Sequence, residues 1–205
     1  MAPRLALSPA FSPAFKSSIQ AGVIFSNFGP SDSYNSGGFR VDLGEALAAP
    51  FTNVADALLG SIEVPVANYS PGSLYFVQMA SDAAGLPGGV LESFANVTFP
   101  STPGIVTVTS ADHPSLAAGG VYWVIVGLQG SDNVQGGQWF VTDPRYGGAF
   151  AWSPYPYESW NPTRTDFPAF RVNSLDSGAV PEPGTIGLTM LGGLALLAIR
   201  RKRSA

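Results

Sequence analysis

The sequence predicts an all-β fold: a β-sandwich or jelly-roll-like domain followed by a single C-terminal transmembrane helix. The 205 residues include 24 Gly and 18 Pro, a fraction typical of loop-rich β domains. Short apolar stretches alternate with turn signals every ~8–12 residues, which indicates a sandwich. An uncharged apolar stretch near the C-terminal end, followed by basic residues, indicates a membrane helix.

Composition narrows the function classes. Charged and aromatic residues each make up 12% of the chain, so the chain holds enough bulky apolar material for a core and too little charge for a disordered protein. Residues 1–179 hold 6 basic and 13 acidic side chains. That acidic balance argues against nucleic-acid binding, which needs clustered Lys and Arg. The absence of cysteine excludes thiol catalysis, disulfides and Cys-ligated zinc.

Two of the strand candidates have informative patterns. Residues 61–66 alternate between apolar and polar positions, as a half-buried strand does, and Pro65 indicates a sheet edge or a strand end. Residues 122–128 are almost continuously apolar, which is typical of a central strand buried on both faces. A single helical turn is expected at residues 54–59. The strand candidates in chain order are 61–66, 74–79, 90–94, 96–99, 105–109, 122–128, 138–142 and 169–172.

The C-terminal region has three parts in a fixed order. V-P-E-P at 180–183 precedes the uncharged segment 184–199, and a basic cluster follows. As a helix the segment would span about 24 Å at ~1.5 Å per residue, somewhat less than a ~30 Å hydrocarbon core. Snorkelling arginines and local thinning can cover the difference. The alternative is a buried core helix in a protein with no membrane step.

This three-part order resembles the PEP-CTERM sorting signal of bacterial proteins processed by an exosortase. The resemblance implies that Pro181, Glu182 and Pro183 form the recognition element. It also implies that the helix holds the protein in the inner membrane during sorting, before the protein reaches the cell surface or the exterior. The basic cluster is expected to stay cytoplasmic; it consists of Arg200, Arg201, Lys202 and Arg203.

The chain therefore divides into five expected segments. An N-terminal segment at 1–21 has prolines where a signal peptide needs an apolar run, and we interpret it as a remnant of a signal region. The sandwich domain then covers 22–173. The rest comprises the linker at 174–183, the transmembrane helix at 184–199 and the cytoplasmic tail at 200–205.

The body has a second resemblance, carried by looser motifs. These motifs are A-P-F-T at 49–52, S-I-E-V-P-V at 61–66, D-A-A-G-L-P-G at 82–88, L-A-A-G-G-V-Y-W at 116–123 and Q-W at 138–139. They resemble the choice-anchored family of extracellular bacterial domains, with type R the nearest subtype. The resemblance implies a β-sandwich on the cell exterior and no established enzyme activity.

Two places in the body are candidate ligand sites. Asp82 lies in a Gly- and Pro-containing loop that could bind calcium, although a tight turn bonded by the Asp82 carboxylate is the preferred interpretation. Residues 147–162 gather aromatics among prolines, which suits a surface for glycans or partner proteins, or equally a cap on an open sandwich edge. The candidate ligand residues there are Trp152, Tyr155, Tyr157 and Trp160.

No catalytic residues can be assigned. His113 is the one histidine of the chain, which makes a zinc site improbable, and no nucleophile elbow accompanies it. The sequence thus predicts a non-enzymatic surface or matrix protein that binds polysaccharide or a partner protein, with no cofactor apart from the calcium considered above. The alternative function is a secreted hydrolase that uses a carboxylate pair. The spacing of the 14 acidic residues identifies no such pair.

Overall fold

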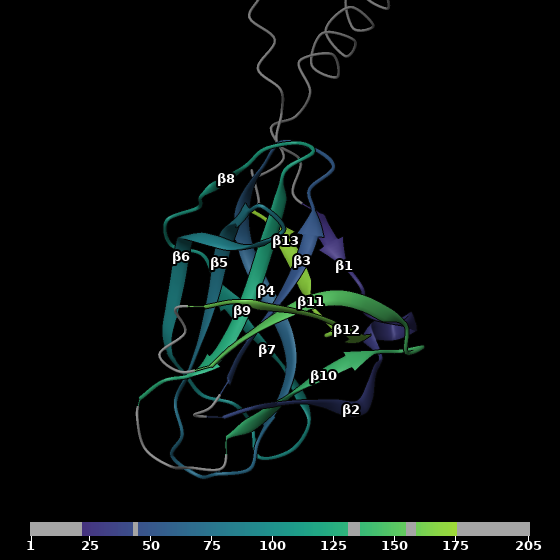
Figure 1. The fold of residues 1–205 in the computed structure, drawn as a ribbon, viewed down its shortest axis with the longest axis vertical. Coiled ribbons are helices and arrows are strands. Elements are labelled where there is room, and N and C mark those ends of the chain that lie inside the picture. Colours follow the sequence, from purple (N-terminus) through teal and green to yellow (C-terminus); the bar gives the residue numbers. More distant parts are fainter. Residues whose placement is uncertain (1–21, 43–44, 131–135, 155–158, 176–205) are drawn as a thin grey trace, which may run out of the picture.

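The computed structural model describes residues 22–42, 45–130, 136–154 and 159–175. Within these ranges the regular elements are thirteen β-strands and one 3-10 turn, η1 (Pro30–Asp32). The strands form two antiparallel sheets (Figure 1). The all-β prediction is confirmed and is consistent with a β-sandwich.

The first sheet has seven strands and is built around the long strand β4 (Ala57–Asn68). Its main path runs β1-β13-β4-β10-β2, and β7 and β8 also pair with β4. The remaining bounds are β1 (Val23–Ser26), β13 (Arg171–Ser174), β10 (Gly137–Thr142), β2 (Tyr34–Val41), β7 (Gly104–Thr109) and β8 (Ser115–Leu116).

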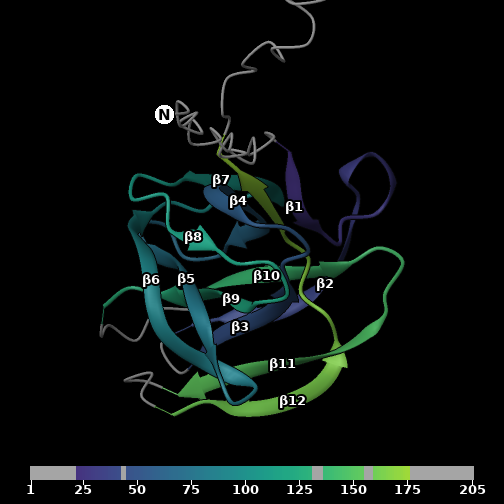
Figure 2. The same cartoon turned by 90° about the horizontal axis from the view of Figure 1, so that it is seen from above.

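The second sheet has six strands in the order β12-β11-β3-β9-β5-β6. Viewed from above, β4, β7 and β1 of the first sheet lie on one side of the molecule, and β11 and β12 of the second lie on the other (Figure 2). The bounds are β12 (Asn161–Asp166), β11 (Gly147–Pro154), β3 (Glu45–Thr52), β9 (Val121–Leu128), β5 (Tyr75–Ala83) and β6 (Leu86–Val97).

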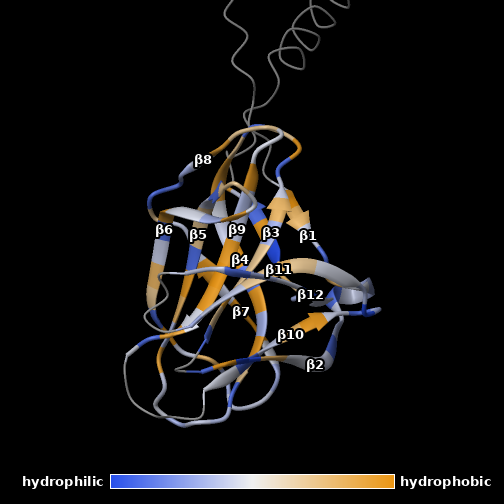
Figure 3. Cartoon of the chain, viewed as in Figure 1, coloured by the Kyte–Doolittle hydropathy of each residue, from blue (hydrophilic) through white to orange (hydrophobic). Residues whose placement is uncertain are grey.

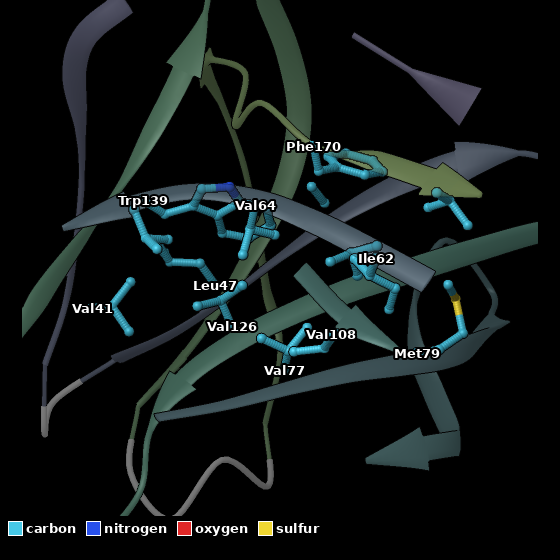
Figure 4. Packing of buried hydrophobic residues seen from close by; sticks show 14 of the residues in the cluster. Val41, Leu47, Ile62, Val64, Val77, Met79, Val108, Val126, Trp139 and Phe170 are labelled. Atoms are coloured by element: carbon cyan, nitrogen blue, oxygen red, sulfur yellow. The ribbon is translucent and has the colours of Figure 1, made fainter. Parts of the chain in front are cut away.

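The main core lies between the two sheets and draws alternate residues from each. Ile62, Val64 and Val66 of β4 are fully buried in it, as the alternation in the sequence predicts. Figure 4 shows Ile62 and Val64 together with Leu47 and Val77 of the opposite sheet. The orange stretches along β9 and β10 in Figure 3 show how strongly apolar these strands are.

Strand β9 confirms the prediction of a central strand. It pairs with β3 on one side and β5 on the other, and every residue after Val121 is buried. Each of the other seven strand candidates also overlaps a strand of the structure. No helix in the described residues is long and apolar enough to cross a membrane. The predicted membrane helix at 184–199 lies outside those residues.

Pro65 corrects one prediction, because it lies inside β4 rather than at an edge or a strand end. On one side of β4, Pro65 pairs with Ile105 of β7. On the other side, β13 pairs with β4 up to Glu63, and β10 begins its pairing at Val66. Pro65 thus falls in the gap between two partner strands, where its missing N–H leaves no ladder bond unmade.

One further expectation was wrong. The helical turn at 54–59 does not form, since β4 begins at Ala57 and its Leu59 N–H bonds the carbonyl of Pro114. The aromatic-rich segment 147–162 contains regular structure. Its first eight residues form β11, and β12 begins at Asn161.

Candidate functional site

The outer face of the six-stranded sheet, which points away from the inter-sheet core, is apolar. Along β9, Tyr122, Val124 and Val126 enter the main core, whereas Trp123 and Ile125 belong to a second hydrophobic cluster. The solvent face of an antiparallel sheet is usually polar. This departure makes the outer face the most informative surface for function.

Small side chains form the floor of this face. Ala48 of β3 lies opposite Ala151 of β11 and Ile125 of β9, and Ala46 lies opposite Ser153. All four of the small residues are fully buried. Because these four side chains have no exposed surface, other side chains cover them, and Phe76, Leu86 and Trp160 pack against the second cluster.

An open pocket of about 350 Å³ lies on this face, and of the four small residues Ala46 lines it. Phe76 and Gln78 of β5 stand at one side of it, and the Gln78 amide donates to Ser93 Oγ at 3.2 Å. Phe76 lies opposite Gly127, and a Cβ atom on Gly127 would lie 2.2 Å from Phe76 Cζ. The lack of a side chain at Gly127 therefore leaves room for the Phe76 ring. The described residues lining the pocket are Ala46, Phe76, Gln78, Gly88, Val90, Ile125 and Trp160.

Trp160 completes the pocket from the far side of the sheet. It directly precedes Asn161, the residue opposite Trp152, and packs half-buried against the second cluster. Trp152 packs instead against the main core between the sheets. The structure thus separates these two predicted ligand residues onto different faces. The other two, Tyr155 and Tyr157, lie outside the described residues.

Asp82 lies in the hairpin between β5 and β6, where both of its carboxylate oxygens accept hydrogen bonds. Trp123 Nε1 donates to Oδ1 at 2.8 Å, and the Gly85 N–H donates to Oδ2 at 3.0 Å. The second bond is the local backbone contact expected of a tight turn. The hydrogen bond from Trp123 Nε1 lets Asp82 hold the Trp123 indole in the second cluster. Within the described ranges, no three His, Cys, Asp or Glu side chains gather as metal ligands would.

A buried carboxylate of β6 has a structural role. Glu92 is 6% exposed, and its oxygens accept bonds from the Ser110 hydroxyl and from the N–H groups of Ala111 and Asp112. It ties the turn after β7 to the six-stranded sheet. His113 lies in the same turn, with Nδ1 3.0 Å from the Leu59 carbonyl oxygen.

Sequence reasoning identified Trp160 but missed the pocket's other principal residues. The strands that contain Phe76, Gln78 and Ile125 have a strongly apolar sequence. That pattern predicts residues of the hydrophobic core rather than residues of a surface pocket. The signal that could have indicated an outer site is the spacing of Ala46 and Ala48, on the opposite face of β3 from Leu47.

The fold and the pocket define an antiparallel β-sandwich domain with an aromatic-walled pocket on one outer face. A family model, the PEP-CTERM protein-sorting motif, matches residues 179–203, directly after this domain. No curated protein matches the chain. The chain therefore carries a PEP-CTERM sorting signal, which indicates an exported surface protein that an exosortase processes.

The predicted sorting residues fall inside the matched segment. It contains the Pro181-Glu182-Pro183 triplet and ends at Arg203, the last residue of the basic cluster. These residues lie outside the described part of the chain, so their roles stay predictions. The resemblance of the body to choice-anchored domains also stays a prediction.

Proposed function

We propose that this protein is a non-enzymatic component of the bacterial cell surface or extracellular matrix whose β-sandwich binds polysaccharide or a partner protein. The sorting motif at 179–203 carries the proposal, because an exosortase signal commits the domain before it to the exterior. In this proposal residues 184–199 span the inner membrane during sorting. The cluster that begins at Arg200 stays cytoplasmic, and the body lies outside.

The placement of acidic side chains supports binding over hydrolysis. A glycosidase needs two carboxyl groups ~5–10 Å apart across a groove. Neither the pocket at Trp160 nor a second one beside Ser174 has a carboxylate among its described lining residues. Glu92 and Asp82 are engaged in the hydrogen bonds given above. Glu63 is paired with Arg171 at 3.1 Å.

Expression with and without an exosortase tests the sorting step. The full chain is expressed in two matched bacterial hosts, and the products are fractionated and weighed by mass spectrometry. We expect loss of the residues after the Pro-Glu-Pro triplet, and release from the inner membrane, only where the enzyme is present. Substitution of Pro181, Glu182 and Pro183 by Ala should leave the chain intact in the membrane of both hosts.

A control substitution outside the motif, Pro114→Ala, should be processed like the unaltered chain. An intact, cytosolic product that needs no detergent in either host would contradict the proposal. It would make residues 184–199 part of an ordinary soluble protein.

A further inference from the structure

We propose that two neighbouring loops at one end of the sandwich contact the headgroup region of the inner membrane while the C-terminal tail is still attached. These paired loops are residues 53–56, between β3 and β4, and residues 117–120, between β8 and β9. The proposal rests on the function proposed above, since it needs residues 184–199 in the bilayer. It names the surface that the unprocessed domain turns toward the lipid.

The paired loops lie at the end of the domain where the chain leaves it. Just after the first loop, Leu58 of β4 pairs with Ser115 of β8. The Leu58 carbonyl also accepts the N–H of Leu175, the last described residue. Figure 1 shows β8 at this end of the molecule. A linker of eight residues, 176–183, then joins Leu175 to the segment proposed to span the membrane, which keeps this end of the domain close to the lipid.

The paired loops expose apolar side chains. Val54, in the first loop, is 82% exposed, which is the largest exposed fraction among the large apolar side chains of the described residues. Val121, which follows the second loop, is 38% exposed, and Ala117 and Ala118 are exposed as well. A valine this exposed gains free energy when the interfacial region of a bilayer takes it out of water.

The backbone of the second loop can leave water at little cost, because its donors are already paired. Each N–H group from 117 to 120 donates to an acceptor within the protein. In that order, the acceptors are the Tyr122 hydroxyl at 2.7 Å, Asp56 Oδ1 at 2.8 Å, the Asn53 carbonyl at 2.7 Å and the Ala117 carbonyl at 3.1 Å. An unpaired N–H group would lose its hydration at the bilayer without compensation.

Asn53 ties the two loops together. It is 1% exposed, its N–H donates to the Gly120 carbonyl at 2.9 Å, and its side-chain amide donates to the Leu116 carbonyl at 2.7 Å. Because both loops are bonded to this buried residue, they are ordered before they meet the bilayer. Contact with lipid therefore costs little conformational entropy.

The charge of the paired loops favours an apolar contact over an electrostatic one. Asp56 is the charged residue of the two loops, and neither loop contains Lys or Arg. Attraction to anionic headgroups needs such basic side chains, so the contact should persist at high salt.

The contact depends on the tail. The exposed apolar area of a few small side chains is too small for stable membrane binding on its own. The tail supplies the difference by holding the paired loops at a high effective concentration beside the lipid. Removal of the tail by an exosortase therefore ends the contact and releases the domain.

Spin labelling of the full chain in proteoliposomes tests the contact. Because the chain has no cysteine, Ala118→Cys, Tyr69→Cys and Leu191→Cys each provide one nitroxide site, in the paired loops, just beyond the opposite end of β4 and in the tail. Each label's accessibility to oxygen, which concentrates in lipid, is compared with its accessibility to a water-soluble nickel chelate. We expect a higher ratio of oxygen to nickel accessibility at position 118 than at position 69, at low and at high salt.

Substitutions at Val54 test its part in the contact. With the label at position 118, Val54→Asp should lower the ratio to that of the label at position 69, because a carboxylate resists leaving water. Val54→Trp should raise the ratio, since tryptophan favours the membrane interface. The matched control is Tyr69→Asp, which places the same charge on an exposed residue at the opposite end and should leave the 118 label unchanged. Near-ultraviolet circular dichroism shows whether each variant is folded.

The label at position 191 separates failure of the contact from failure of the proposed function. If that label is as accessible to nickel as the label at position 69, the tail does not span the bilayer, and the proposed function fails together with the contact. With the 191 label in lipid, equal ratios at 118 and 69 would overturn the contact alone. So would a ratio at 118 that Val54→Asp leaves unchanged or that high salt abolishes. Dipolar broadening at 118 that disappears on dilution with unlabelled chain would also overturn it, by assigning the paired loops to a second copy of the protein.

Discussion

Burial determines how readily the hydroxyl of Tyr75, at the start of β5, loses its proton. The residue is fully buried, its ring stacks on Phe99 with 3.8 Å between centroids, and its hydroxyl donates to Asn68 Oδ1 at 2.8 Å. Burial disfavours the charged phenolate and raises the pKa of Tyr75 to about 12. The folded state therefore holds this proton at a pH where the unfolded chain has lost it.

Stability should consequently fall in alkali. Below the unfolded pKa of about 10 the contribution of Tyr75 is complete, and it is lost as the pH rises toward 12, at about 1.4 kcal/mol per unit. Tyr75→Phe should remove this dependence, at a cost of about 1 kcal/mol near neutral pH for the lost hydrogen bond. Urea unfolding of a fragment of residues 22–175 across this pH range measures both effects.

Tyr69→Phe is the control for the alkaline experiment. Tyr69 is 55% exposed, so its replacement should leave the dependence on pH as it is in the unaltered fragment. If Tyr75→Phe loses stability in alkali as steeply as the unaltered fragment does, the Tyr75 proton is not responsible.

Strands were predictable where local pattern and tertiary environment agree. Residues 61–66 alternate and 122–128 are almost continuously apolar, and both are strands. Ile62, Val64 and Val66 are buried as predicted, and so is the whole of 122–128. Strand β3 was missed because its alanines are weak strand formers, and they face an apolar cluster rather than solvent. Strand β12 was missed because Pro162 and its polar neighbours resemble a loop.

The residues of the candidate site also divide into those that a local sequence pattern predicts and those that it does not. Trp160 was predictable from the density of aromatics around it. Phe76 and Ala46 were not, because their place in one pocket depends on β3, β9 and β5 lying side by side, a long-range register that no local pattern specifies.

The β5–β6 hairpin holds strain that a substitution can relieve. Ala84 and Gly85 form its two-residue turn with φ of 56° and 83°, so both occupy the left-handed region. Glycine adopts this region at little cost, whereas the Cβ atom of alanine makes it strained. Asn-Gly is the favoured pair for such a turn, so Ala84→Asn should stabilise the fold by about 0.5–1 kcal/mol.

The opposite change tests the same hairpin. Gly85→Ala adds a Cβ at a φ of 83° and should destabilise by about 1 kcal/mol or more. Thermal unfolding of both variants beside the unaltered fragment gives the comparison. A lower midpoint for Ala84→Asn would show that the turn prefers its present residue.

At the scale of the whole molecule, the two ends of the described domain meet. The Leu175 N–H donates to the Leu58 carbonyl, and the Ser174 N–H donates to the Gly22 carbonyl at 2.8 Å. The residues from 176 to 183 can reach at most about 29 Å, at ~3.6 Å per residue. With residues from Gly184 on held in the membrane, as proposed above, this end of the sandwich must stay near the bilayer until processing.

The length of strand β4 shows how far the opposite end of the sandwich lies from the end where the chain leaves it. Leu58 is beside the exit of the chain and pairs with Ser115, whereas Asn68 ends the strand ten residues further on. At ~3.3 Å per residue the two ends of β4 are about 33 Å apart. Because the chain has no cysteine, Ser115→Cys and Tyr69→Cys each provide a single labelling site, one at either end.

Energy transfer from a dye at each cysteine to a lipid-headgroup acceptor in proteoliposomes should be stronger from position 115 than from position 69. The short linker causes this difference, because it holds one end of the sandwich near the lipid. A flexible Gly-Ser insertion after Leu175 should therefore make the energy-transfer signals from positions 115 and 69 similar. Both signals should vanish once an exosortase has released the protein. Equal transfer from the two positions in the unprocessed chain would mean that the sandwich lies flat on the bilayer, with its pocket no further from the lipid than its termini.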